Sequence, residues 1–399
     1  MIGNFDQESR PRVDWLQLFA VLALIAVGSA FIYSATASNE IFSSRPWFRQ
    51  PGIWHMIYGL VGLTAGAVIC CFDYRLLSRW AIVAYWGSIL LLVAVFLVGK
   101  EVYGARRWID FGPVQIQPSE FAKIAFIFMM ASYLSRPIDE LKQPVVFWRA
   151  IGLMLLPFLL ILKEPDLGSA LLFLPVGFGM LWAAGTPAKW LARLVGVGVT
   201  LIVLLLIDIL FAPPQWQFKL EEYQRRRLLV YFGIDFAANA PAAERARLRR
   251  EQRAHSYNAE QALISVGSGG WFGKGWGQGQ QITLGYLPRA VAHNDFIFSV
   301  IAEEKGFLGS ILVISLYSIV LFTGIRTAAQ ARDRLGRLLA VGVVTLMFSQ
   351  VFINIGMNIR IMPVTGVPLP LLSSGGSSVL CSLIAAGVLQ NIHLYRRNY

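Results

Sequence analysis

Long apolar runs, separated by short polar connections, make up most of this chain. A helix needs about 20 residues to cross the apolar core of a bilayer, and ten runs meet or approach that length. We therefore predict an all-α integral membrane protein in which residues 1–399 form a single polytopic domain of about ten transmembrane helices. The predicted spans are 15–36, 53–72, 81–98, 119–135, 147–163, 168–184, 191–211, 296–323, 338–357 and 375–393.

The composition supports this class. Charged residues make up 15% of the 399 residues and hydrophobic residues 56%, whereas soluble domains carry about 25% charged residues. So few charges cannot cover a water-facing surface, which excludes soluble multidomain proteins. The first run, 15–36, is longer than the roughly 7–15 apolar residues of a signal peptide, so we expect an uncleaved span. Cysteines inside apolar runs and scattered histidines indicate neither a disulfide framework nor a metal cluster.

The distribution of basic residues predicts the topology. An even number of spans places both termini on one side, and the short loops of that side carry about twice as many Lys and Arg as the others. Because basic loops stay in the cytoplasm, we predict cytoplasmic termini and two external loops, 99–118 and 212–292.

The loop 212–292, between the seventh and eighth predicted spans, is the longest polar segment of the chain. Its arginine-rich stretches 221–231 and 242–254 are expected to form short amphipathic helices at the headgroups. The loop is basic overall, which suits an anionic substrate or simply anionic lipids. Nucleic acid is excluded as a partner because this surface is expected to lie outside the cell membrane.

The strongest candidate for chemistry is Asp295, in the sequence His293-Asn294-Asp295 directly before the eighth span. Partial desolvation at a membrane boundary would raise the pKa of its carboxyl and make it a better general base. The alternative is that Asp295 only places a negative charge in the first helical turn, where the helix dipole favours it.

Three further charged residues follow along the same segment. At 100° per residue, Glu303 lies about 80° around the helix from Asp295, whereas Glu304 lies about opposite. Glu303 is therefore the better candidate to face a cavity. Alternatively, Lys305 neutralises one of the two glutamates.

The loop 99–118 carries Arg106 and Arg107 beside Trp108, which could bind a phosphate and stack on a sugar. Glu120 and Lys123 are i,i+3 neighbours at the start of the next span. Either they satisfy each other, or Lys123 holds a phosphate and Glu120 orients it.

Three connections have unusual compositions. In the turn around Asp166, ordinary turn chemistry explains the Pro, Asp and Gly, although not the number of charges. The glycine-rich segment 267–277 lacks the spacing of a P-loop, because Gly275 follows the lysine. Pro363–Gly376 is apolar but too rich in Pro and Gly for a helix, so we expect an irregular loop at the edge of a cavity.

Taken in order, seven motifs resemble the SEDS family of cell-wall proteins, which includes RodA, FtsW and SpoVE. They extend from Gly104 to Ser378, and the ten-span layout resembles the family over the whole chain. The motifs are GARRWIDFG, QPSEFAK, EPDLGSA, YQRRRL, ISVGSGGWFGKGWGQG, HNDFIF…AEEKGFLG and INIGM…PVTGVPLPLLSSGGSS. Within the family, GKGW and GVPLPL look more like RodA, the elongation member, than like the division member.

The resemblance implies a peptidoglycan glycosyltransferase in the bacterial cytoplasmic membrane. Such an enzyme polymerises lipid II into a growing glycan strand beside a class B penicillin-binding protein. Asp295 matches the family's essential aspartate. Substrate-binding residues are then expected among the other motif positions, namely Arg106, Trp108, Glu120, Lys123, Asp166, Arg225, Arg227, His293 and Glu303.

The chain also departs from the family pattern. Asn294 stands where Thr is usual, the stretch 287–292 is longer and lacks a common Glu, and Ser374 replaces a common Tyr. Asn358-Ile359-Arg360 replaces a small stretch that ends in Gly. Asp295 is intact, so we still expect activity.

The resulting hypothesis is an inverting transfer in which Asp295 takes the proton of the acceptor sugar's 4-hydroxyl. Arginines, or a divalent cation such as Mg²⁺ or Mn²⁺ held mainly by substrate phosphates, would stabilise the pyrophosphate leaving group. The alternatives are a lipid II transporter (a flippase), a non-catalytic scaffold for the penicillin-binding partner, and the division-type polymerase.

Overall fold

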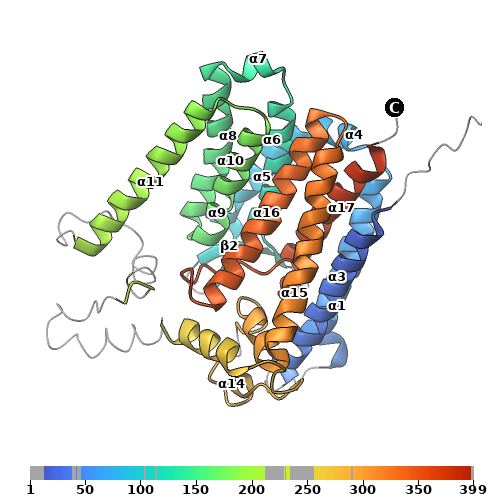
Figure 1. The fold of residues 1–399 in the computed structure, drawn as a ribbon, viewed down its shortest axis with the longest axis vertical. Helices are drawn as coiled ribbons and strands as arrows, with labels where there is room; N and C mark the ends of the chain where they lie inside the picture. Colours follow the sequence, from blue (N-terminus) through green and yellow to red (C-terminus); the bar gives the residue numbers. More distant parts are fainter. Residues whose placement is uncertain are drawn as a thin grey trace, which may run out of the picture.

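The computed structural model describes residues 13–37, 42, 46–102, 105–112, 115–211, 229, 231–233, 256–288 and 291–396. Helices dominate these residues, and most run roughly along one direction as a bundle (Figure 1). Of the predicted external helices, 221–231 and 242–254 lie almost wholly outside the described residues.

Each predicted apolar run coincides with a helix or, in one case, with a pair of helices. Eight helices are long and apolar enough to cross a membrane, whereas α6 has 17 residues and the α9–α10 pair is divided at Leu172. The membrane class is therefore confirmed, and the count of ten spans stays a prediction. The ten are α1 Trp15–Ala37, α3 Pro51–Cys70, α5 Ala81–Val98, α6 Pro118–Leu134, α8 Pro144–Lys163, α9 Leu167–Leu171 with α10 Phe173–Ala183, α11 Ala188–Phe211, α15 Ile297–Gln330, α16 Arg334–Asn358 and α17 Gly376–Tyr395.

Local sequence explains where several helices begin. Proline occupies the first position of α3, α6 and α8, where its missing N–H costs nothing. Asp73, Asp166 and Asp333 cap other helices by accepting a backbone N–H. Short elements join the long helices, namely η1 Trp47–Arg49, α4 Tyr74–Arg79, α7 Ile138–Leu141 and α14 Gln280–Thr283, and residues 256–268 are helical as well.

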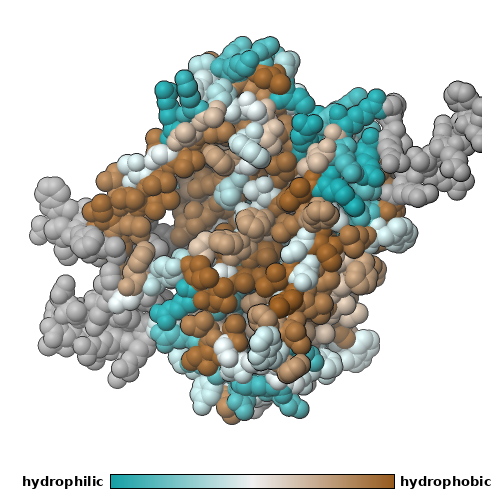
Figure 2. Space-filling model, viewed as in Figure 1, coloured by the Kyte–Doolittle hydropathy of each residue, from teal (hydrophilic) through white to brown (hydrophobic). Residues whose placement is uncertain are grey.

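Small residues allow the bundle to pack closely. A Cβ added at Gly387 of α17 would lie 2.7 Å from the Cα of Gly66 in α3, so these two backbones nearly touch. By contrast, α11 extends away from the bundle and is almost wholly exposed (Figure 1). Figure 2 shows a brown apolar zone across the middle of the molecule, with hydrophilic surface near both ends. This distribution fits a protein that crosses a bilayer.

The two ends of the described chain lie together. Arg326, near the end of α15, donates to Asp14, and the same carboxylate oxygen is 3.9 Å from Nδ1 of His393 in α17. The first and last described residues therefore lie at the same end of the bundle, and the placement of the termini relative to the membrane stays a prediction. The end of the bundle with α4 and α7 lies on this side, and the opposite end, which we call the outer end, carries α14 (Figure 1).

The loop 99–118 contains a small sheet that we did not predict. Strands β1 Lys100–Val102, β2 Ala105–Asp110 and β3 Gln115–Ile116 form an antiparallel sheet with β2 in the middle. Lys100 pairs with Trp108, and Ile109 pairs with Ile116. The sequence signal was a short run with Trp and Ile between glycines, which favours a hairpin.

The predicted span 296–323 is not one continuous helix. Gly306 has φ +65° and ψ −157°, which interrupts α15. Residues of the segment 267–277 cross at this point, and Phe307 N donates to Gly270 O at 2.8 Å. A Cβ at Gly273 would lie 2.2 Å from Glu304 O, so only glycine allows this approach.

Candidate active site

Asp295 lies in a turn, residues 291–296, whose backbone is held at three successive carbonyls. His293 O accepts from Ser374 N at 3.0 Å, and Asn294 O accepts from the Ser373 hydroxyl at 2.6 Å. Asp295 O accepts from the side-chain amides of Asn354 at 3.0 Å and Asn358 at 3.1 Å. The half-buried Asp295 carboxylate is therefore carried on a fixed backbone at the outer end of the bundle.

The irregular segment Pro363–Gly376 supplies much of this support. Its residues 363–375 form neither helix nor strand, which confirms the predicted irregular backbone, whereas the place at a cavity edge stays a prediction. The loop is anchored at Val367 O by Asn354, at Pro370 O by the Tyr317 hydroxyl and at Leu371 O by the His55 ring. Each anchor comes from a different helix, namely α16, α15 and α3, so the bundle fixes the loop.

The same loop joins Asp295 to the turn around Asp166. A Cβ added at Gly366 would lie 3.8 Å from Oδ2 of Asp295. On the other side of the loop, a Cβ at Gly168 would lie 2.7 Å from Thr365 O. The tertiary structure therefore brings the Asp295 and Asp166 motifs against one shared segment.

Asp166 performs two structural tasks. Its Oδ1 accepts from Ser169 N at 3.1 Å and so caps α9, and its Oδ2 accepts from the Gln117 side chain at 3.3 Å. The turn-chemistry interpretation is therefore confirmed for this residue. Gln117 also donates its N–H to Ser377 Oγ at 3.1 Å, which ties the start of α6 to that of α17.

Of the residues predicted on strand β2, Arg106 is exposed and Trp108 is half-buried. The guanidinium of Arg107 donates to the backbone carbonyls of Glu164 and Pro165. Arg107 therefore fastens the sheet to the α8–α9 turn, whereas the neighbouring Arg106 is exposed at the surface.

Glu164 is a buried carboxyl that the sequence analysis did not select. It is 1% exposed, and its carboxyl oxygens accept no hydrogen bond from the residues that the structure describes. Burial and, to a smaller extent, the neighbouring Asp166 raise the pKa of Glu164 to about 8, whereas Arg107 opposes the shift. A group with this pKa holds its proton at neutral pH.

Glu120 and Lys123 form a buried ion pair. Lys123 Nζ lies 2.7 Å from Glu120 Oε1, and both side chains are at most 3% exposed. The structure therefore shows the first of the two alternatives, in which these residues satisfy each other in the first turns of α6.

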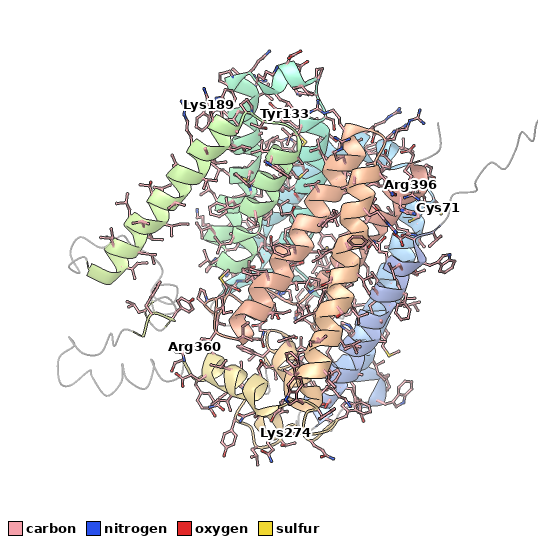
Figure 3. All side chains as sticks on the ribbon, viewed as in Figure 1. Cys71, Tyr133, Lys189, Lys274, Arg360 and Arg396 are labelled. Carbon is pink, nitrogen blue, oxygen red and sulfur yellow. The ribbon has the colours of Figure 1, made fainter. Side chains whose placement is uncertain are left out.

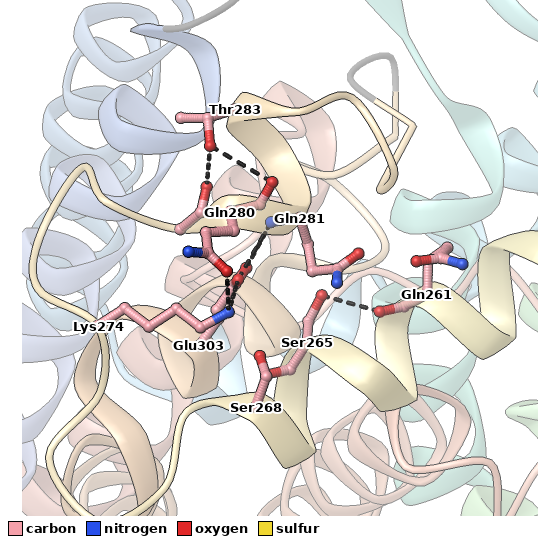
Figure 4. A network of polar contacts seen from close by, with 9 residues as sticks. Gln261, Ser265, Ser268, Lys274, Gln280, Gln281, Thr283 and Glu303 are labelled. Carbon is pink, nitrogen blue, oxygen red and sulfur yellow. Dashed lines mark hydrogen bonds and ion pairs between the residues drawn. The ribbon is translucent and has the colours of Figure 1, made fainter.

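Glu303 is also held in a pair, but with a residue far along the chain. Lys274 Nζ lies 2.7 Å from Glu303 Oε1, and Gln281 N donates to the same oxygen at 3.1 Å (Figure 4). Glu304 instead accepts from the Ser34 hydroxyl at 2.5 Å. Lys274, rather than Lys305, neutralises Glu303, and the pair fastens the glycine-rich segment to α15.

The remaining candidates are placed as follows. His293 is buried, and its ring meets Phe42 edge-on at 5.5 Å between centroids. Arg225 and Arg227 lie outside the described residues. Across the described part of the chain, no group of three or more His, Cys, Asp or Glu could hold a metal ion.

Sequence analysis missed the neutral residues that hold Asp295. His55, Tyr317, Asn354 and Ser373 are all buried polar side chains, most of them inside apolar helices. Polar residues within a membrane span are themselves a functional signal. We selected mainly charged residues and the motif positions, so these side chains were not predicted.

The fold and the site together define a polytopic membrane protein with an aspartate-centred polar site at the outer ends of its helices. Residues 14–398 match the family model described as cell cycle protein, of FtsW, RodA and SpoVE. The chain belongs to this family, which confirms the resemblance found in its motifs.

Relatives and solved structures agree with this assignment. MrdB of Escherichia coli K12, named a peptidoglycan glycosyltransferase, is 35% identical over 387 residues, covering 96% of this chain and 94% of MrdB. FtsW of Geobacter metallireducens, named a probable peptidoglycan glycosyltransferase, is 33% identical over 391 residues, covering 96% and 94%. A solved chain from a peptidoglycan synthase complex that coordinates polymerization and crosslinking has a TM-score of 0.75 and 28% identity, covering 97% and 99%.

Proposed function

We propose that this protein is a peptidoglycan glycosyltransferase that polymerises lipid II at the outer face of the bacterial cytoplasmic membrane. The observation that carries the proposal is the fixed backbone around Asp295, at the outer end of a chain in this family. Both substrates keep lipid tails in the bilayer, which explains why the site lies at the ends of membrane helices. Both termini lie in the cytoplasm, as the excess of basic residues on their side favours.

In this mechanism Asp295 accepts the proton of the acceptor sugar's 4-hydroxyl while that oxygen attacks the anomeric carbon of the donor. The bond between the anomeric carbon and the phosphate oxygen breaks with inversion, and undecaprenyl pyrophosphate leaves. The leaving group gains negative charge, so cationic side chains nearby lower the barrier. Arg106 is the exposed candidate among the described residues, and Arg225 and Arg227 are the candidates in the long loop.

The polymerase acts in cell elongation and works beside a class B penicillin-binding protein. Its GKGW and GVPLPL sequences support the elongation role, as does the similarity to MrdB. The similarity to a chain of a peptidoglycan synthase complex supports a cross-linking partner. Restoration of rod shape in a strain depleted of its elongation polymerase tests the role, and restored division without rod shape would assign the division role instead.

Polymerisation of purified lipid II tests the activity directly. Wild type and Asp295→Asn are compared in detergent with the cognate penicillin-binding protein, whose own glycosyl transfer is absent. Asp139→Asn is the matched control, because Asp139 is an exposed aspartate on α7, at the other end of the bundle. We expect polymer from wild type and the control but none from Asp295→Asn. No polymer from folded wild type would contradict the proposal and favour transport or scaffolding, and equal polymer from Asp295→Asn would remove Asp295 as the base.

A further inference from the structure

Two asparagines of α16 are buried at its outer end, one helical turn apart. Asn354 and Asn358 are both 0% exposed, and their i,i+4 spacing places them on the same face of the helix. Each donates to Asp295 O. Polar side chains at such depth are costly unless every hydrogen-bonding group is satisfied.

The amide of Asn358 is fully used. Its Nδ2 donates to Asp295 O at 3.1 Å and to Asn354 O at 2.8 Å, which occupies both hydrogens. Its Oδ1 accepts from Ser299 Oγ at 2.5 Å and from Ser299 N at 3.3 Å. The side chain of Asn358, on α16, therefore links Asp295, which lies two residues before α15, to Ser299 in the first turn of α15.

These contacts restrict how Asp295 can move. Fixing the carbonyl of a residue limits rotation of its backbone and hence the direction of its side chain. The Nδ2 group of Asn354 donates to both Asp295 O and Val367 O. Asn358 donates a second side-chain hydrogen bond to the Asp295 carbonyl. The carboxylate, by contrast, is half-buried and can meet a substrate.

We propose that Asn358 is a positioning residue. It sets the direction of the Asp295 carboxylate by holding the backbone carbonyl of Asp295 and by its hydrogen bond with Ser299. The proposal rests on the function proposed above. A reacting group that is misplaced by about 1 Å can cost about 100-fold in rate. Loss of one of the two side-chain hydrogen bonds to the Asp295 carbonyl should reduce the rate by less than this. We therefore expect about a 10-fold lower kcat with KM changed less than about 2-fold.

Asn358→Val tests the proposal, and Asn391→Val is its matched control. Asn391 in α17 is also 0% exposed and has the same kind of environment. It donates to Ile69 O and Phe72 O, and it accepts from Tyr74 N. It holds backbone groups at the opposite end of the bundle, so its loss should lower the melting temperature without changing kcat per folded enzyme.

A double variant separates positioning from stability. Asn358→Val leaves the Ser299 hydroxyl buried without its acceptor, which lowers stability. Adding Ser299→Ala removes both partners, so the melting temperature should recover partly, whereas kcat should stay low because Asp295 O still lacks its second donor. If Asn358→Val alone does not fold, the double variant supplies the kinetic comparison.

Initial rates of lipid II polymerisation, normalised to folded protein, decide the outcome. A lower kcat for Asn358→Val and for the double variant, with an unchanged kcat for Asn391→Val, supports the proposal. Equal kcat values for the two single variants would overturn it, as would a kcat that recovers with the melting temperature. Inactive wild type would instead overturn the proposed function, and the inference would fall with it.

Discussion

At the scale of single residues, buried carboxyls in this protein are satisfied in different ways. Glu303 and Glu120 each have a lysine within 2.7 Å. Glu164 has no hydrogen-bond partner among the described residues, although Arg107 lies nearby. Because an isolated buried charge is unfavourable, Glu164 is expected to be protonated at neutral pH.

The first prediction concerns the pH dependence that Glu164 imposes. Its pKa is raised from 4.5 to about 8 in the folded protein, so the folded state binds a proton that the unfolded state releases. The contribution of Glu164 to stability should therefore be fully present below about pH 4.5 and should be lost as the pH rises through about 8. Each pKa unit corresponds to about 1.4 kcal/mol, so Glu164→Gln should stabilise the protein by several kcal/mol at pH 8.5.

Melting temperatures in detergent between pH 5 and 9 measure this effect. The increase in melting temperature that Glu164→Gln causes should be small at pH 5 and largest at pH 8.5. Glu140→Gln, on the exposed α7, controls for the loss of a surface carboxylate. A gain that is the same at both pH values would contradict the prediction.

The second prediction concerns the Lys274–Glu303 pair. Lys274→Met leaves the Glu303 charge buried, because this side chain is 1% exposed. Removing one partner of a buried pair typically costs about 3–5 kcal/mol, and about 3 is expected here because Lys274 is partly exposed and Gln281 N still donates to the carboxylate. The double variant Lys274→Met/Glu303→Gln should recover part of that loss. Thermal unfolding is the measurement.

The exposed pair Lys142–Asp139 provides the control for this substitution. Lys142 Nζ lies 2.9 Å from Asp139, but both side chains are largely exposed. Lys142→Met should therefore leave the melting temperature unchanged. Similar decreases in melting temperature for Lys142→Met and Lys274→Met would show that burial does not determine how much the Lys274–Glu303 pair contributes to stability.

At the scale of elements, backbone geometry explains one departure from the family pattern. After α16, Arg360 N donates to Met357 O and Ile361 N donates to Gly356 O, the arrangement of a Schellman motif. The motif requires a left-handed residue, and Arg360 has φ +62°. In the family this stretch usually ends in Gly, which fits the left-handed conformation that the helix end requires. In this chain Arg360 adopts that conformation with some backbone strain.

The third prediction follows from that strain. Arg360→Gly should raise the free energy of unfolding by about 1 kcal/mol, because glycine adopts the left-handed conformation without steric cost. Arg360→Ala retains a Cβ and should give no such gain. Both variants lose the same charge, so the difference between their melting temperatures isolates the backbone effect. A larger gain for Arg360→Ala than for Arg360→Gly would refute this explanation.

At the scale of the whole molecule, charged residues at opposite ends of the bundle mark its two sides. Figure 3 shows Lys274 and Arg360 toward the outer end, and Lys189 and Arg396 toward the other.

The fourth prediction tests the orientation. Leu284, after α14, is 64% exposed at the outer end, and Asp139 lies in α7 at the other. In a background with Cys71→Ser, a membrane-impermeant maleimide should label Leu284→Cys in intact cells. Asp139→Cys should react only after the membrane is opened. The reverse pattern would place the termini outside and would contradict a lipid II polymerase of this topology.

The sequence alone determined the membrane class and the positions of the long helices, and it predicted a role for Asp295. These features are local, because a span needs a continuous apolar run and a charge at its end stands out within a few residues. The irregular loop Pro363–Gly376 was predictable for the same reason, since its prolines and glycines exclude a helix.

Only the tertiary structure decided which groups meet. Lys274 pairs with Glu303 across 29 residues, and Asn358 meets Ser299 across 59. No periodicity indicates that 267–277 would cross α15 at Gly306, or that two amides of α16 would hold Asp295. The helices determine where along the chain a side chain lies, but packing between distant segments determines its hydrogen-bond partner. A buried polar group needs such a partner, and here the partner comes from a segment far along the chain.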